Sequence, residues 1–459
     1  MQLHHMPQTS THSERLQLAG SSSKRGSTRA WTLSLLAISS VIFLALFLRR
    51  PDALPNSQFW AEDALVFFTQ QITLGFSKAI FHPYAGYLHV IPRLIAFLVS
   101  SLPAKWIPFA YSFLTLVISS LCCAAFAGPW CRSLLRSDGL RATCCLIVAT
   151  GLQFGKELIG VVANLQWFLA IGAAALIFRD KQTREPAWLS ITLAVLGVLI
   201  GLTAPLTFVF APFLLAQSLT NRGLKRLAPV LMLAALILQL FIAHTTSHVD
   251  RSVHFNVGQV FVTTVVAIIS RPVTASLLGH SYLGHNSDVG LVAWWTFALI
   301  VVSVWLTGLG ISVHGQRRRV LWGACYVGVV ATLIPVLTRN FIGMFGSVYG
   351  LKYTTGERYF VLSAAVFVFL VAFTIDCWCA KAPERLKAGI LLTVFLLGII
   401  NNFRVPRYKN FHWGSYAPQV EQWRDAMRNG KPAHQVVIPI NPDGWQLTLP
   451  GENGSLPVR

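Results

Sequence analysis

The sequence has few charged residues, and acidic residues are especially scarce. Asp and Glu number 17 among 459 residues, and all charged residues together make up 12%, which is about half of their share in a soluble globular protein. Apolar residues make up 54% and gather in continuous runs, many of which approach the roughly 20 residues of a membrane-spanning helix. The composition excludes an ordinary soluble domain and predicts an all-α polytopic membrane protein.

Motifs that would identify several common enzyme classes are also missing. The chain has no glycine-rich phosphate loop, no HExxH and no GxSxG, which argues against a nucleotide-driven pump, a zinc protease of that type and a serine hydrolase. The eight cysteines lie within or beside apolar runs and lack zinc-finger spacing. We therefore expect buried thiols, with no disulfide framework and no cysteine metal site.

The net charge of +20 comes largely from short Lys and Arg clusters between the apolar runs. Such clusters mark cytoplasmic loops, and anionic lipid headgroups are their expected partners. We therefore expect the lipid bilayer to be a partner and nucleic acid not to be one, with the protein in the cytoplasmic (inner) membrane. The clusters are Arg179-Lys181-Arg184, Arg222-Lys225-Arg226, Arg317-Arg318-Arg319 and Lys381-Arg385-Lys387.

Polar and apolar stretches divide the chain into three parts. Residues 1–30 are rich in Ser and Thr and predict a disordered cytoplasmic leader. We expect residues 31–402 to form the transmembrane domain, with about ten to twelve transmembrane segments and a first outer loop at 51–86. Residues 403–459 carry one amphipathic helix signal and one strand-like run, and we expect a small extracytoplasmic C-terminal cap there.

The topology around residues 88–102 has two solutions. If 88–102 and 106–127 both cross the membrane, the loop with Arg132, Arg136 and Arg141 falls outside, against the charge rule. Either 88–102 is only partly inserted, or this loop breaks the rule.

In two other segments the helical sequence pattern is interrupted by polar residues or proline. The apolar run 258–279 contains Arg271-Pro272 and is either a full span or a re-entrant segment. Asp63–Ile80 can be written as one helix with an apolar face interrupted by polar residues, and we expect it to lie along the membrane interface.

The first outer loop holds the one adjacent acidic pair of the chain, Glu62-Asp63. We predict that Asp63 is a general base that takes a proton from an attacking hydroxyl. Glu62 is the second candidate, orienting the base or binding a metal ion; its alternative is a carboxylate beside a helix N-terminus. Residues suited to hold a sugar and a phosphate follow within about thirty positions: His82, Tyr84, Tyr87, His89 and Arg93.

Two later segments are predicted to face the same outer compartment and to help bind the sugar and the phosphate. Their residues are Lys156, Glu157, Asn164, Gln166, Glu357, Arg358 and Tyr359. Arg358 would clamp a phosphate, and its alternatives are an ion pair with Glu357 or a side chain that reaches the interface. Such cations, or a divalent cation such as Mg²⁺ or Mn²⁺, would stabilise charge on a departing phosphate.

Three stretches carry a resemblance to a known family: WAED after the first span at 31–48, FHPYAGYLHVIPR, and GERYF at 356–360. Together with the order of spans and the long first outer loop, they resemble the GT-C superfamily of integral membrane glycosyltransferases. The resemblance implies a GT-C-like bundle, a polyprenyl-phosphate-linked sugar as donor and catalysis on the outer face.

The resemblance therefore predicts a membrane glycosyltransferase. It would move a sugar from polyprenyl phosphate to an envelope glycan, lipid or protein in an inverting single displacement. The alternative is a flippase or transporter of lipid-linked sugars, which would bind the same headgroup without breaking a bond.

Overall fold

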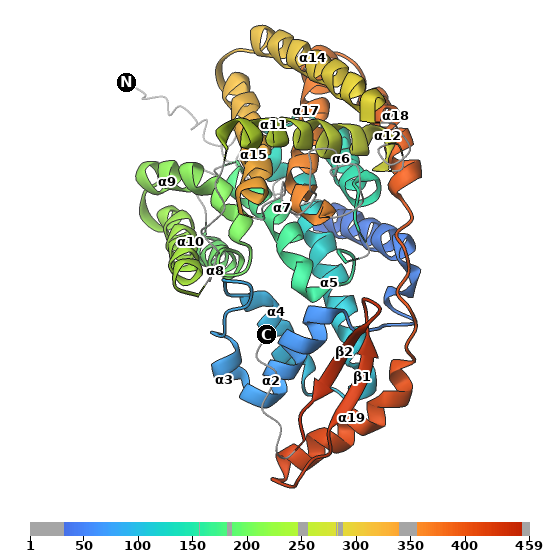
Figure 1. The fold of residues 1–459 in the computed structure, drawn as a ribbon. Helices are drawn as coiled ribbons and strands as arrows, with labels where there is room; N and C mark the ends of the chain where they lie inside the picture. The colour runs from blue at the N-terminus through green and yellow to red at the C-terminus, as the bar shows by residue number, and fades with distance from the viewer. Residues whose placement is uncertain are drawn as a thin grey trace, which may run out of the picture.

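The computed structural model describes residues 32–155, 157–180, 186–246, 256–280, 282, 288–338 and 356–451, and helices dominate it (Figure 1). Seven helices in this part of the chain are long and apolar enough to cross a membrane. The chain is therefore a helical multi-pass membrane protein, as its composition predicts. The predicted leader at 1–30 lies outside the described residues.

The seven long apolar helices are Thr32–Arg49, Ala104–Ala127, Gly223–Thr246, Val257–Leu278, Gly290–Ser312, Gly315–Thr338 and Glu357–Trp378. Four shorter apolar helices accompany them: Val90–Val99, Val162–Ile177, Ala187–Gly201 and Pro205–Thr220.

The labelled helices of the first half are α2 Thr69–Leu74, α3 Phe76–Ala79, α4 Val90–Val99, α5 Ile107–Ala124, α6 Asp138–Gly151, α7 Leu165–Ile177, α8 Ala187–Gly201, α9 Ala211–Thr220 and α10 Leu227–Thr246. Those of the second half are α11 Val257–Ile268, α12 Ser276–Leu278, α14 Asp288–Ser312, α15 Gly315–Thr338, α17 Val361–Trp378, α18 Glu384–Asn402 and α19 Trp413–Arg428. Short 3-10 segments include η6 Val162–Asn164, η7 Pro205–Phe210 and η11 Glu357–Phe360.

The helices pack mainly in pairs, and the pairs share one hydrophobic core. α5 packs on α7, α6 on α18, α8 on α10, and α15 on α17. Figure 1 shows α11, α14, α15, α17 and α18 at one end of the molecule, and α2, α3, α4, α19 and the small sheet at the other.

The outer helices keep apolar side chains exposed. The first helix buries Ile42 and Leu46 but exposes Leu33 and Leu44, and α14 exposes Phe297 together with much of its apolar surface. Contiguous exposed apolar helix faces of this extent are those of a protein in contact with lipid.

The length of helix α4 favours one of the two predicted topologies of residues 88–102. It has 10 residues and is about 15 Å long, half of the thickness of a bilayer core. A partly inserted segment therefore fits, and the arginine loop after α5 then stays on the side that the charge rule requires. The orientation relative to the membrane stays a prediction.

The segment around Arg271-Pro272 is one continuous helix without a break. α11 passes into a π-helix, η9 Ile269–Ala275, and then into α12. A π-helical turn accommodates the proline, whose missing N–H and ring would otherwise interrupt an α-helix. Of the two predicted alternatives, the full span fits the 22 residues of Val257–Leu278.

The single helix predicted over Asp63–Ile80 is wrong. A π-helix, η2 Asp63–Phe68, leads into α2, and the chain breaks at Gly75 before α3. Gly75 has φ +71°, a conformation that a side chain would strain. Most of η2 is buried, so this part lies inside the protein and not along its surface.

The C-terminal part contains the predicted helix and strand. α19 is followed by β1 Val436–Ile440, which pairs antiparallel with β2 Trp445–Leu449. The backbone N–H of Asn441 donates to the carbonyl of Phe59 at 3.1 Å, and the Trp413 indole donates to the carbonyl of Ala104 at 2.9 Å. These contacts pack the C-terminal part on the first loop and on the segment directly before α5; the predicted domain boundaries stay predictions.

Arg49, at the end of the first helix, joins the ends of two others. Its buried guanidinium donates to the carbonyls of Ala149 and Leu152 at the end of α6, at 2.5 and 2.8 Å. It also donates to the carbonyls of Asn402 and Phe403 at the end of α18, at 2.9 and 3.1 Å. The last carbonyls of a helix lack partners within the helix, and a cation is favoured beside them.

We expect Arg49→Met to destabilise the protein by at least about 3 kcal/mol, because each buried carbonyl left without a donor costs about 1–3 kcal/mol. Thermal unfolding in detergent, followed by tryptophan fluorescence, measures the loss. Arg407→Met is the matched control, since Arg407 is exposed. An equal effect of the two substitutions would contradict the role assigned to Arg49.

Candidate functional site

Asp63 caps the start of a helix that lies about a hundred residues further along the chain. Its Oδ2 accepts a hydrogen bond from the backbone N–H of Val162 at 3.1 Å, and its Oδ1 accepts one from Ala163 at 2.9 Å. These N–H groups open η6, which continues as α7. The contact satisfies two donors that a helix start leaves unpaired, and the helix dipole favours a carboxylate there.

Burial changes the proton affinity of Asp63. The side chain is almost fully buried, and burial raises the pKa of its carboxyl to about 7, against the two backbone hydrogen bonds, which lower it. The neighbouring charge of Glu62 also raises this pKa, and Arg50 lowers it. A carboxyl group with this pKa exchanges its proton near neutral pH.

One carboxylate oxygen of Glu62 accepts no hydrogen bond from the described residues. The side chain is half-buried, and its Oε2 is buried without a hydrogen bond from any residue that the structure describes. Glu62 lies close enough to Asp63 and Arg358 for electrostatic interaction with both. A buried carboxylate oxygen with open capacity is a position where a ligand can donate a hydrogen bond.

Arg358 comes from the other end of the sequence to the same place. Its guanidinium forms an ion pair with Glu157, lies 5.1 Å from the ring centroid of Tyr359 and donates to the Tyr359 hydroxyl at 3.3 Å. Tyr359 in turn meets Trp167 edge to face at 5.2 Å. The ion-pair partner is thus Glu157, and the predicted alternative pair with Glu357 is wrong.

Glu357 contacts other residues than Arg358 does. Its Oε1 accepts from the Gln153 amide at 3.4 Å, and it interacts electrostatically with Arg271. Arg271 donates to Gln153 Oε1 at 3.2 Å. Gln153 and Arg271 were not predicted as site residues, although an arginine at membrane depth is a signal of function.

Asn164 and Gln166 hold the segments of the site together. Asn164 donates to the carbonyl of Glu157 at 2.9 Å and accepts from the Trp167 indole at 3.3 Å. Gln166 donates to the hydroxyl of Tyr87 at 2.8 Å. Both amides are buried, so they position loops and neighbouring side chains.

The segment FHPYAGYLH forms a tight turn beside α7. Tyr84 and Tyr87 exchange backbone hydrogen bonds at 2.9 and 3.2 Å, with φ of +52° at Ala85 and +87° at Gly86. Positive φ at both central residues is the type I′ hairpin geometry. The turn places Tyr87 over His89, with ring centroids 4.2 Å apart.

His89, His82 and Arg93 form the inner side of this turn. Burial, helped by Arg93, lowers the pKa of His89 to about 3, so His89 is neutral near pH 7. The exposed His82 has a pKa lowered by partial burial and by Arg93. Arg93 is fully buried and donates to the carbonyls of His82 at 3.0 Å and Val66 at 3.4 Å. Its guanidinium thus anchors the first loop, and the predicted phosphate contact would require it to leave these carbonyls.

Arg50 and Tyr408 form a further buried group near Asp63 that was not predicted. The Arg50 guanidinium lies 3.9 Å from the ring centroid of Tyr408 and donates to the carbonyl of Ile159. Asp52 Oδ2 accepts the backbone N–H of Tyr408 at 3.0 Å. The Arg49-Arg50 pair directly after an apolar run was the available signal.

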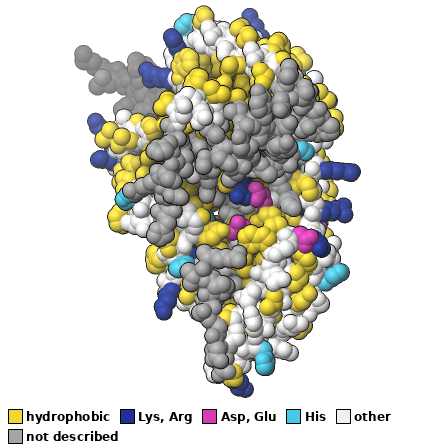
Figure 2. All heavy atoms as spheres, viewed as in Figure 1, with side chains coloured by type: hydrophobic (Ala, Val, Ile, Leu, Met, Phe, Trp, Pro, Cys, Tyr) yellow, Lys and Arg dark blue, Asp and Glu magenta, His cyan; other side chains and the backbone are white. Residues whose placement is uncertain are grey.

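The residues gathered around Glu62, Glu157 and Arg358 define the candidate site, which we call the Glu62–Arg358 cluster. Figure 2 shows a basic and an acidic side chain next to each other near the middle of one face, with hydrophobic side chains on one side of them. Lys156, also predicted for the site, lies outside the described residues. Among the residues with described positions, no group of three or more His, Cys, Asp or Glu is arranged to hold a metal ion.

Fold and cluster together define a multi-pass helical membrane protein with an acidic and basic group at one end of α17. Comparison with protein-family models, curated proteins and solved structures found no match for the chain.

The raised pKa of Asp63 predicts a pH-dependent stability. Between about pH 4 and pH 7 the folded protein holds this proton more tightly than the unfolded chain, so this contribution to stability is present at low pH and is lost as the pH rises through about 7. The D63N protein lacks this titration. We expect the stability advantage of the wild type over D63N to be larger at pH 5 than at pH 8, by thermal unfolding in detergent.

The control is D443N, which changes an exposed carboxylate and should shift the unfolding temperature by the same small amount at each pH. A difference between wild type and D63N that stays constant from pH 5 to pH 8 would contradict the raised pKa.

Proposed function

We propose that the chain is a GT-C-type membrane glycosyltransferase that moves a sugar from a polyprenyl-phosphate donor to an envelope glycan, lipid or protein. The observation that carries the proposal is the meeting of Glu62, Glu157 and Arg358, which come from three distant segments of the chain. A carboxylate oxygen that accepts no other hydrogen bond can take the proton of the acceptor hydroxyl. The guanidinium beside it can stabilise the charge on the departing phosphate.

Glu62 is the proposed base. Both oxygens of Asp63 already accept backbone hydrogen bonds, whereas Glu62 Oε2 accepts none from the described part of the chain. In the proposed reaction the acceptor hydroxyl gives its proton to Glu62 while its oxygen forms the bond to the anomeric carbon. Asp63 is a positioning residue, because it fixes Glu62 relative to α7.

Arg358 is the proposed partner of the phosphate. As the new bond forms, the bond between the anomeric carbon and the phosphate oxygen breaks, and its electron pair leaves with the polyprenyl phosphate. The phosphate gains one negative charge, which a guanidinium stabilises through charge-assisted hydrogen bonds. Glu157 holds the guanidinium in place before the donor binds.

The polar residues around the cluster have supporting roles in this proposal. Asn164, Gln166 and Tyr87 are buried and use their polar groups on one another or on the Glu157 backbone. They fix the positions of the loops around the site. A sugar would contact these polar groups only after a rearrangement. Exposed His82 remains free to meet a ligand at the rim.

We expect E62Q to lower sugar transfer by about 10²–10⁴-fold, the usual contribution of a general base. Purified protein is reconstituted with radiolabelled undecaprenyl-phosphate sugars, glucose, mannose and arabinose in turn, and with lipid extract of the envelope as acceptor. Transfer is read as label in the acceptor fraction together with released undecaprenyl phosphate.

The control for this experiment is E384Q, at a glutamate that contacts Ser137 and Gly139 and follows the opposite end of α17 from Arg358. Full activity of a folded E62Q protein would overturn the assignment of the base. Movement of labelled donor across the bilayer without release of undecaprenyl phosphate would replace the transferase with the flippase.

R358Q should weaken the retention of undecaprenyl phosphate, the leaving product. Hydrogen bonds to charged groups contribute about 1.5–3 kcal/mol, so we expect product inhibition by undecaprenyl phosphate to weaken by at least about tenfold. R404Q, at an exposed arginine, should leave the inhibition unchanged. Equal inhibition of wild type and R358Q would show that Arg358 does not hold the phosphate.

A further inference from the structure

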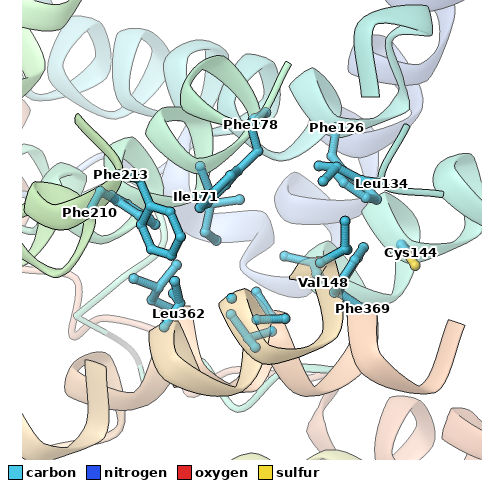
Figure 3. Close-up of a pocket in the computed structure, with 18 of the residues that line it drawn as sticks. Phe126, Leu134, Cys144, Val148, Ile171, Phe178, Phe210, Phe213, Leu362 and Phe369 are labelled. Carbon is cyan, nitrogen blue, oxygen red and sulfur yellow. The ribbon is translucent and has the colours of Figure 1, made fainter. Parts of the chain in front are cut away.

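An apolar pocket lies inside the helical bundle, away from the Glu62–Arg358 cluster. Its volume is about 300 Å³, at the lower end of the range for small-molecule sites. Figure 3 shows aromatic side chains from several helices pointing into it, among them Phe126, Phe178, Phe213 and Phe369. None of the residues assigned to the candidate site lines it.

The polar side chains of the lining, apart from cysteines, are Gln316 and Arg319. Both are exposed and lie in the first turns of α15. Arg317, two residues earlier, is bound to Asp376 at 2.7 Å, but Arg319 has no hydrogen bond or ion pair within the described ranges. The pocket is thus an apolar space with a guanidinium in its lining that has no partner among the described residues.

Helices α15 and α17 contribute part of the lining of the pocket. Along α15 the lining runs from Gln316 to Val327, eleven residues or about 16 Å of helix. This length suits an extended hydrocarbon chain, and the surrounding Phe side chains provide the contacts that such a chain makes.

The charged end of the pocket lies far from the Glu62–Arg358 cluster. Arg317 binds Asp376 near the end of α17, while Arg358 stands just before its start. The 18 residues between Arg358 and Asp376 correspond to about 27 Å, close to the thickness of a bilayer core. A lipid headgroup at Arg319 therefore belongs to the opposite leaflet from a ligand at the cluster.

We propose that this pocket binds one hydrocarbon chain of an anionic phospholipid whose phosphate contacts Arg319. The apolar lining selects a chain, and the guanidinium in that lining selects an anionic headgroup. The neighbouring exposed Arg318 adds to a positive field that attracts anionic lipid. This site is independent of the proposed transferase activity, since it shares no residue with the cluster.

Photolabelling in nanodiscs tests the proposal. The probes are phosphatidylglycerol and phosphatidylcholine with the same diazirine-bearing acyl chain, and the labelled residues are located by peptide mass spectrometry. We expect phosphatidylglycerol to label residues 320–327 and 362–369 about fivefold more than phosphatidylcholine, the ratio that corresponds to one Arg contact with an anionic lipid.

Arg319→Gln should reduce labelling by phosphatidylglycerol to the level of phosphatidylcholine. Arg318→Gln is the matched control, because Arg318 is exposed on the same helix turn but does not line the pocket; it should keep most of the preference. Ala324→Leu, which narrows the pocket, should reduce labelling by both lipids.

Arg319 is exposed, so its substitution tests the proposal even if Ala324→Leu fails to fold. Equal labelling by the two lipids in the wild type, unchanged labelling in Arg319→Gln, or no labelling of these segments would each overturn it.

Discussion

The two hydrogen bonds that Asp63 accepts from Val162 and Ala163 attach the first loop to the start of α7. α7 packs on α5 and α17, and its Trp167 meets Tyr359 at the start of the last long apolar helix. The buried carboxylate of Asp63 therefore helps to set the position of Glu62 relative to Arg358. Without it, two backbone donors would be left unsatisfied inside the protein, at a cost of about 1–3 kcal/mol each, and the loop would lose its contact with the start of α7.

Other buried arginines also bind backbone carbonyls inside the protein. Arg49 serves the ends of α6 and α18, and Arg141, also fully buried, donates to the carbonyl of Leu135 at 2.6 Å and pairs with Asp138. Arg93 and Arg271 are likewise engaged inside the protein. Such arginines are not free charges in a loop, so they carry less weight in a topology argument than the exposed Arg318 and Arg319. The conflict over the loop after α5 arose partly because the sequence does not distinguish the two kinds.

Much of the fold follows from local patterns, because an apolar run of about 20 residues has few stable states in a membrane other than a helix. The same holds for α19 and β1, whose amphipathic and strand-like patterns are short-range. The candidate site is different. Glu157 and Arg358 are 201 positions apart, and no periodicity pairs them. The break at Gly75, the π-helix at Pro272 and the burial of Asp63 depend on tertiary packing, which overrides the 3.6-residue pattern that suggested one helix over Asp63–Ile80.

The two ends of α17 show why open hydrogen-bonding capacity, and not charge alone, locates the candidate site. Asp376 is buried, and it is surrounded by donors: the Arg317 guanidinium at 2.7 Å, the Arg136 backbone N–H at 3.3 Å and the Lys387 ammonium at 3.7 Å. Both oxygens of this carboxylate have partners, and these contacts hold neighbouring helices together. At the other end Glu62 keeps a buried oxygen without a donor among the described residues, next to a guanidinium that is only partly buried. Because buried polar atoms are nearly always paired in a folded protein, with protein groups or with water, this oxygen can accept a hydrogen bond from a ligand or from a water molecule.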